Sequence, residues 1–363
     1  MYQLHRISSE NPMHVLKVVP ITCSDEATEL EDLLEANPHL LPGDQMAGDD
    51  QDAYRWMLIK RQMPVESASS GVELLALDLL FVDQFGWLTF VECKLRSNAE
   101  AYRKIVGQML EYVSSAQHYW TAEKIGKYLT AGNLETLAPS IPTVEGFSKL
   151  AIENLKAGKV RLVFLLDEAP RELKAIATFL NEQLSETEVF VVELRHFQDG
   201  DRKFVMPLVF GYSEEASARR KEKEGKWSSD DFRQALISSG ENDDERRALM
   251  KLVTFCEKYP RHWGRGKQPA CSAVLPCSAP RSAVTYWPNG DVTLNLDYMS
   301  IAAADALQSA LKVAQIHFKS GQKFPAVKRE AWTPRVDQFI AALDSAARMG
   351  ITSGVTMGVE KKL

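Results

Sequence analysis

The chain has 363 residues, of which 45% are hydrophobic and 25% charged, and its formal net charge is −6. This length allows two domains that each bury a core, and the composition is that of a globular protein. No apolar run reaches membrane-spanning length, and the start of the sequence lacks the basic and apolar regions of a signal peptide. We therefore expect a cytoplasmic protein that has no membrane partner.

The five cysteines are scattered and odd in number, which argues against a framework of disulfide bonds. Four residues could in principle gather around zinc: Cys256, His262, Cys271 and Cys277. No pair among them has the CxxC spacing of common zinc sites, so zinc is the minor alternative.

Residues 1–20 predict two short strands around a Glu10-Asn11-Pro12 turn, and a helix follows between Ser24 and Asn37. Its apolar stripe consists of three leucines: Leu30, Leu33 and Leu34. At 100° per residue, Glu26 projects near the centre of this stripe and Glu29 onto its margin. On the same projection Glu31 and Glu35 point away from it.

Residues 54–63 (YRWMLIKRQM) predict the first strand of a sheet, and a hairpin comes next. Its first strand, LLALDLLFV, holds Asp78 inside an apolar run, and its second, WLTFVECKL, carries Glu92 and Lys94. Residues two apart on a strand share one face, so these two side chains point the same way.

The turn at Gln84-Phe85-Gly86 sets the register of this hairpin. A three-residue loop commonly ends in a residue at positive φ, which glycine adopts without steric cost. Closing the loop in that way pairs Asp83 with Trp87 and places Asp78 directly opposite Glu92. A slip of one residue would turn Asp78 to the other face, so this prediction depends on the turn type.

Two carboxylates and an ammonium are costly to bury inside an apolar sheet without a partner. Asp78 and Glu92 together offer hard oxygen ligands suited to Mg²⁺ or Mn²⁺, and Lys94 could orient a water or offset charge on a phosphate. The simpler interpretation is that both are ordinary strand acids paired with Lys94. The helix predicted over residues 98–119 adds a polar stripe at steps of four: Lys104, Gln108 and Tyr112.

This arrangement resembles the PD-(D/E)xK nuclease superfamily over about residues 20–210. Asp78 matches the first acid, Glu92-Cys93-Lys94 the ExK element, and Gln108 with Tyr112 the QxxxY signature of the RecB-like and NucS-like branches. Leu77 stands where the family usually has proline.

The resemblance implies a Mg²⁺- or Mn²⁺-dependent nuclease with a catalytic set of five residues: Asp78, Glu92, Lys94, Gln108 and Tyr112. It also implies a metal held by Asp78, Glu92, the Cys93 backbone carbonyl and a glutamate of the first helix. Glu26 is our choice for that glutamate because of its acid-then-LxxLLxxNP context, and Glu29 is the alternative. Both could equally be helix-start acids favoured by the helix dipole.

Beyond residue 119, the first part of the chain predicts mostly helices and loops over 120–158. A buried strand (VRLVFLL), a helix over 171–184 and two further strands follow. We therefore expect an α/β fold, a restriction-endonuclease-like mixed sheet flanked by helices, over residues 1–212. A charge-dense linker follows at 213–226, and then a smaller α+β domain at 227–363. This second domain is expected to contain helices, including one over 300–319, and short strands between 270 and 296.

Charge differs between the two parts. Residues 1–226 carry 25 basic and 35 acidic side chains, whereas residues 227–363 carry 18 and 14. An excess of positive charge favours phosphate binding, so we expect the C-terminal part to contact the substrate. The expected nucleic-acid contacts are Lys104, Arg261, Arg265, Lys267, Lys328 and Arg329, although solvated basic loops would give the same pattern.

The function expected from the sequence is hydrolysis of phosphodiester bonds, in DNA more than in RNA, and in repair or defence. A homodimer is compatible with this role. The alternative is a catalytically inactive module that binds nucleic acid or protein on a nuclease scaffold.

Overall fold

A computed structural model describes residues 5–7, 15–47, 53–67, 72–96, 101–138, 141, 143–211, 229–263, 270–279 and 281–349. The chain divides into two compact units, and each is described by itself. The first unit takes most of residues 1–223, and the second takes residues 224–363 together with Ala47–Asp52 and Leu134–Pro142. The predicted linker at 213–226 lies outside the described residues.

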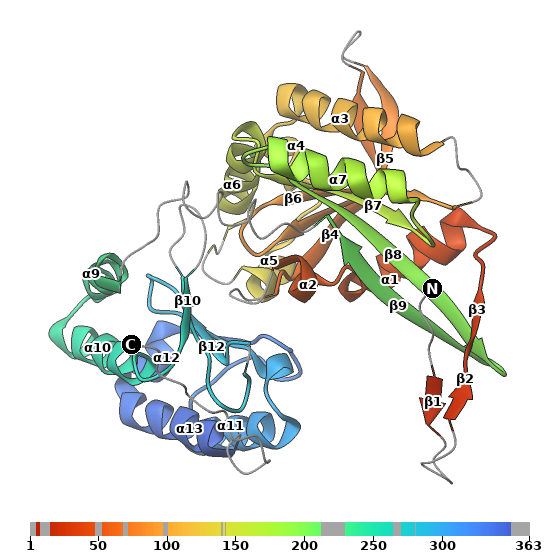
Figure 1. Ribbon diagram of the computed structural model, residues 1–363. Coiled ribbons are helices and arrows are strands. Elements are labelled where there is room, and N and C mark those ends of the chain that lie inside the picture. The colour runs from red at the N-terminus through yellow and green to blue at the C-terminus, as the bar shows by residue number, and fades with distance from the viewer. Residues whose placement is uncertain are drawn as a thin grey trace, which may run out of the picture. The chain divides into compact units, whose positions relative to one another are not determined.

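The first unit is built on a mixed sheet of seven strands (Figure 1). Its order is β3-β8-β7-β6-β5-β4, and β9 pairs with β8 beyond this path. Strands β6, β7 and β8 are parallel, and the other pairs are antiparallel. The strands are β3 (Val19–Ile21), β4 (Trp56–Glu66), β5 (Glu73–Asp83), β6 (Leu88–Lys94), β7 (Val160–Leu166), β8 (Glu188–Asp199) and β9 (Arg202–Phe210). A separate antiparallel pair joins β1 (His5–Ile7) to β2 (Val15–Lys17).

Helices accompany this sheet between its strands. They are η1 (Ala27–Glu31), α1 (Asp32–Ala36), η2 (Pro38–Leu40), α2 (Gly43–Ala47), α3 (Ala101–Tyr119), α4 (Ala122–Gly126), α5 (Ala131–Leu137), α6 (Val144–Lys156) and α7 (Arg171–Gln183). Helix α3 packs on β4 and β6, and α7 packs on β8 and β9. The expected mixed α/β architecture is confirmed.

The central strands are buried because their side chains are apolar on both faces. Every residue of β7 is buried, and in β6 only Lys94 is partly exposed. Such continuous apolar runs are typical of strands covered on both sides by helices. Lys94 therefore marks the end at which β6 leaves the core.

The register of the central hairpin follows from its turn. Gly86 has a φ of 75°, and the Asp83 N–H donates to the Trp87 carbonyl at 3.2 Å. The pairs continue along the ladder to Leu79 opposite Val91. The predicted register is confirmed, and it leads to Asp78 opposite Glu92 one step further on.

A buried ion group joins the ends of β5, β7 and β8. Arg161 donates from Nη1 to Asp83 Oδ2 and from Nε to Glu188 Oε2, each at 2.6 Å. The guanidinium also lies over the Tyr54 ring, 3.7 Å from its centroid. All three charged residues are buried, so each charge depends on the others for compensation.

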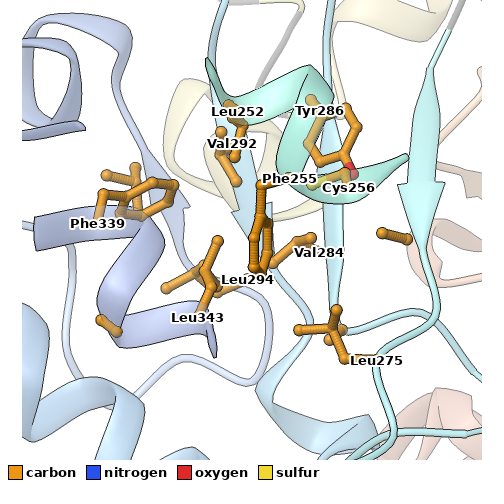
Figure 2. Close-up of a cluster of buried hydrophobic side chains, with 14 of the residues drawn as sticks. Leu252, Phe255, Cys256, Leu275, Val284, Tyr286, Val292, Leu294, Phe339 and Leu343 are labelled. Atoms are coloured by element: carbon orange, nitrogen blue, oxygen red, sulfur yellow. The ribbon is translucent and has the colours of Figure 1, made fainter. Parts of the chain in front are cut away.

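The second unit contains a small antiparallel sheet in the order β10-β11-β12-β13-β14. Its elements are α9 (Ser229–Ser239), α10 (Asp243–Cys256), β10 (Arg261–Trp263), β11 (Cys271–Ala273), β12 (Val284–Tyr286), β13 (Val292–Leu294), η3 (Leu296–Tyr298), α11 (Ile301–Val313), β14 (Ala326–Val327), α12 (Arg329–Trp332), η4 (Thr333–Arg335) and α13 (Val336–Met349). Figure 2 shows its core, where Phe255 of α10 lies among Val284, Leu294 and Leu343.

Helix α11 ends at Val313, which is earlier than the helix expected over 300–319. Gln315 has a φ of 55°, and the Ile316 N–H donates back to the Leu311 carbonyl at 2.9 Å. A left-handed residue just after a helix is the usual way in which its last carbonyls find partners.

The helices in the described parts of the chain are all too short or too polar to cross a membrane.

Candidate active site

Asp78 and Glu92 occupy neighbouring strands at the open end of the central hairpin. The Asp78 carboxylate accepts from the Cys93 backbone N–H at 2.8 Å through Oδ2, and from the Gln62 amide at 3.2 Å through Oδ1. Burial raises the pKa of Asp78, and these two hydrogen bonds act in the opposite direction. The carboxylate is thus held at both oxygens.

Glu92 is the most deeply buried acid of the site, with 4% of its surface exposed. Its Oε2 atom is buried and has no hydrogen-bond partner among the described residues. Burial, and then the nearby charge of Asp78, raises the pKa of Glu92 to about 8. A buried carboxylate oxygen without a donor is costly unless a proton or a cation compensates it.

Lys94 connects the hairpin to the first helical segment. Its Nζ atom donates to Glu26 Oε1 at 2.7 Å, and the next backbone N–H, that of Leu95, donates to Glu26 Oε2 at 3.0 Å. Burial lowers the pKa of Lys94. The hydrogen bond to Glu26 and the charges of Glu92 and Asp78 raise it by more, so the pKa lies above its ordinary value. Lys94 therefore remains an ammonium near neutral pH.

The first helix does not have the regular geometry that the sequence projection assumed. Residues Ala27–Glu31 form a π-helical turn, and the Asp32 N–H donates to the Ala27 carbonyl. In a π-turn, residues five apart lie nearly above one another, so Glu31 follows Glu26 onto the inner face. The expectation that Glu31 points away is wrong: it is 7% exposed, and the charge of Asp78 contributes to its raised pKa. Burial is the larger cause of that shift.

Glu29 has a different role from Glu26. Its Oε2 atom accepts from the backbone N–H groups of Ser24 and Asp25, at 2.5 and 3.0 Å. These hydrogen bonds, that of Asp25 first, lower its pKa. Glu29 therefore caps the start of the helix, and of the two candidates only Glu26 reaches Lys94.

Gln62 and Glu31 are the residues that the sequence pattern did not reveal. The Gln62 Nε2 atom lies 3.2 Å from Glu31 Oε2 and 3.2 Å from Asp78 Oδ1, so one amide joins two acids. Glu31 is also bound by Arg61 Nε at 3.1 Å. A bulge in β4 and a positive φ at a glutamine leave no clear signal in a sequence.

Helix α3 carries the QxxxY pair. Tyr112 is buried, and its hydroxyl donates to the Ala76 carbonyl of β5 at 3.1 Å instead of bonding Lys94. Gln108 is half-buried, and its side-chain amide forms no hydrogen bond with the described residues. Lys104 is exposed. Tyr112 thus ties α3 to the strand that holds Asp78, and Gln108 remains available to a ligand.

The basic residues expected to contact nucleic acid in the second unit belong to local ion pairs where they are described. Arg261 lies 3.6 Å from Glu257, Lys328 lies 3.0 Å from Asp291, and Arg329 lies 2.9 Å from Glu241. Arg265 and Lys267 lie outside the described residues. Contact between these groups and nucleic acid remains a prediction.

In the observed geometry, no three His, Cys, Asp or Glu side chains among the described residues stand close enough together to hold a metal ion. The donor set of the hairpin nevertheless fits a hard divalent cation, because the buried Glu92 Oε2 atom lacks a partner beside Asp78. The cysteines considered for zinc are buried and form no disulfide bonds.

Compared with protein-family models, curated proteins and solved structures, the chain shows no match.

Proposed function

We propose that the protein is a metal-dependent nuclease of the restriction-endonuclease-like class that hydrolyses phosphodiester bonds, in DNA more than in RNA. The observation that carries this proposal is the Glu92 carboxylate, buried without a partner for Oε2 and close enough to Asp78 for that charge to raise its pKa. Lys94, two residues along the same strand, adds a permanent ammonium. Buried acids whose pKa is strongly raised concentrate at functional sites.

Asp78, Glu92 and Glu26 are the residues that would hold Mg²⁺ or Mn²⁺, with the Cys93 carbonyl as a further oxygen. Bound there, the cation would polarise a phosphoryl oxygen and lower the pKa of a water molecule. Protonation competes with this binding, because ligand carboxylates must be ionised. Because the pKa of Glu92 is high, a cation that binds there must displace the proton that this carboxyl holds near neutral pH.

Lys94 acts as a hydrogen-bond donor and not as a base. Its raised pKa keeps three N–H donors on Nζ at neutral pH, and one of them is directed at Glu26. The remaining donors can orient the attacking water or stabilise negative charge that develops on the phosphate. The contact with Glu26 fixes the position of the ammonium for that task.

Gln108 and Tyr112 contribute from α3. Tyr112 positions β5 through the Ala76 carbonyl, and Gln108 is able to donate to a phosphate or to the water. The second unit would supply substrate recognition through its basic residues, and a homodimer would let two sites act on a duplex.

The test is to incubate the full chain with Mn²⁺ or Mg²⁺ and a panel of single-stranded, duplex and branched DNA and RNA. We expect cleavage that EDTA abolishes and that Asp78→Asn lowers at least about 100-fold. Cleavage by this variant at the rate of the parent would overturn the proposal. A catalytically inactive binding module would instead retain nucleic acid without cutting it, and Mn²⁺ would not stabilise it.

A further inference from the structure

Gln62, at the edge of the candidate site, has an unusual backbone conformation. Its φ is 49°, a region that residues other than glycine rarely occupy. Gln315, at a φ of 55°, is the other such residue among those described, and it follows the end of a helix, where this conformation is ordinary. Gln62 instead lies within strand β4, next to an irregularity between Leu58 and Lys60.

Packing does not explain this conformation. The Gln62 side chain is exposed, so no buried apolar contact compensates the strained backbone. The conformation instead allows two polar contacts. The Gln62 Nε2 atom reaches Glu31 Oε2 and Asp78 Oδ1, both at 3.2 Å. Strained residues that are held by their surroundings concentrate at functional sites.

The geometry uses both amide hydrogens. An amide nitrogen carries two N–H groups, so it can donate one hydrogen bond to each carboxylate. Without it, the two acids would face each other with like charges, and only the Cys93 N–H would orient Asp78. Glu31 would keep Arg61 as its donor, so the larger loss falls on Asp78.

We propose that Gln62 is a positioning residue, which fixes the Asp78 carboxylate for the cation and links it to Glu31 on the π-turn. This inference rests on the proposed function and deepens it. Gln62 lies beside the ligand and does not itself bind the cation. Groups that orient a metal ligand in this way commonly change metal affinity by about 10- to 100-fold when they are removed.

The test uses Gln62→Met, which keeps the length of the side chain and removes both N–H groups. The matched control is Gln198→Met in β8, where a strand glutamine donates to the Gly200 carbonyl at 2.7 Å. Mn²⁺ binding to the full chains is measured by electron paramagnetic resonance without substrate. We expect Gln62→Met to weaken binding about tenfold or more and the control to match the parent. In cleavage assays kcat should fall while KM for DNA stays constant.

A double-mutant cycle then separates positioning from a general effect on the fold. Unfolding of the parent, Gln62→Met, Asp78→Asn and the double variant is followed in EDTA, where no metal contributes. If the amide holds Asp78, the shifts in the unfolding midpoint are non-additive. Additive shifts, or unchanged Mn²⁺ affinity in Gln62→Met, would overturn the inference. If the parent neither binds Mn²⁺ nor cuts DNA, the proposed function is wrong. The double-mutant cycle would still show whether Gln62 and Asp78 interact.

Discussion

Lys94 Nζ lies 2.7 Å from Glu26 Oε1, although 68 residues separate them in the chain. This contact fastens the first helical segment to the end of β6, and the Leu95 N–H adds a second hydrogen bond to the same carboxylate. One glutamate thus serves both the fold and the candidate site.

Lys94→Met should abolish most cleavage while leaving the protein folded. The thioether keeps the unbranched chain, one atom shorter, but offers no charge or donor to a phosphate, so we expect a loss of at least about 100-fold. Cleavage rates and circular dichroism are measured together. Lys149→Met in α6, which removes an exposed lysine paired with Glu145, is the control and should cut like the parent.

Glu26→Gln and Glu29→Gln should differ although they lie three residues apart. Glu26 contacts Lys94, so Glu26→Gln is expected to weaken Mn²⁺ binding and to slow cleavage. Glu29 accepts two backbone N–H groups at the start of the helix, so Glu29→Gln should cost up to about 1 kcal/mol of stability. Its Mn²⁺ affinity should equal that of the parent. If Glu29→Gln weakened Mn²⁺ binding more than Glu26→Gln did, Glu29 would be the metal ligand and Glu26 would not.

The stability of the metal-free protein should fall between about pH 5 and 8 because of Glu92. Its pKa rises on folding from the ordinary glutamate value of 4.5 to about 8, so the folded chain holds this proton more tightly than the unfolded chain within that window. Each pH unit there weakens the fold by at most about 1.4 kcal/mol. Glu92→Gln removes the titrating group, and its stability should depend less on pH.

Denaturant unfolding in EDTA at pH 5, 6.5 and 8 measures this difference. Saturating Mn²⁺ should reduce the slope for the parent and leave Glu92→Gln unchanged, because the cation takes the place of the proton. Equal slopes for parent and variant in EDTA would show that Glu92 is not the responsible group.

Arg161→Met should destabilise the first unit strongly without involving the site. Removing the guanidinium leaves Asp83 and Glu188 buried without their cation, and breaking such a group typically costs about 3–5 kcal/mol. Chemical unfolding is the measurement. Lys149→Met breaks a fully solvated pair, so it should produce no measurable change. Similar losses in both variants would show that the buried group contributes little.

The hairpin could be predicted from the sequence because its geometry is set locally. Gly86 selects the turn, the turn sets the register, and the register places Asp78 opposite Glu92. The face of the first helical segment on which Glu31 lies could not be predicted in the same way. Projection onto a regular helix assumes 3.6 residues per turn, whereas Ala27–Glu31 form a wider turn.

The contribution of Gln62 could not be predicted from the sequence either. Its amide reaches both acids from a position of positive φ in the irregular strand β4, and neither the bulge nor this φ has a clear signal in the local sequence. The end of α11 was missed for a local reason, since Gln315 takes a conformation more often marked by glycine or asparagine.

The wide turn at Ala27–Glu31 makes the spacing of this segment as important as its composition. An ordinary helix over the same residues would place Glu31 about 140° around the axis from Glu26. Glu26 and Glu31 would then face different directions, even with every acid still present. Homologous chains that conserve the chemistry should therefore keep either this five-residue spacing in a wide turn or a four-residue spacing in a regular helix, where the two acids again share a face.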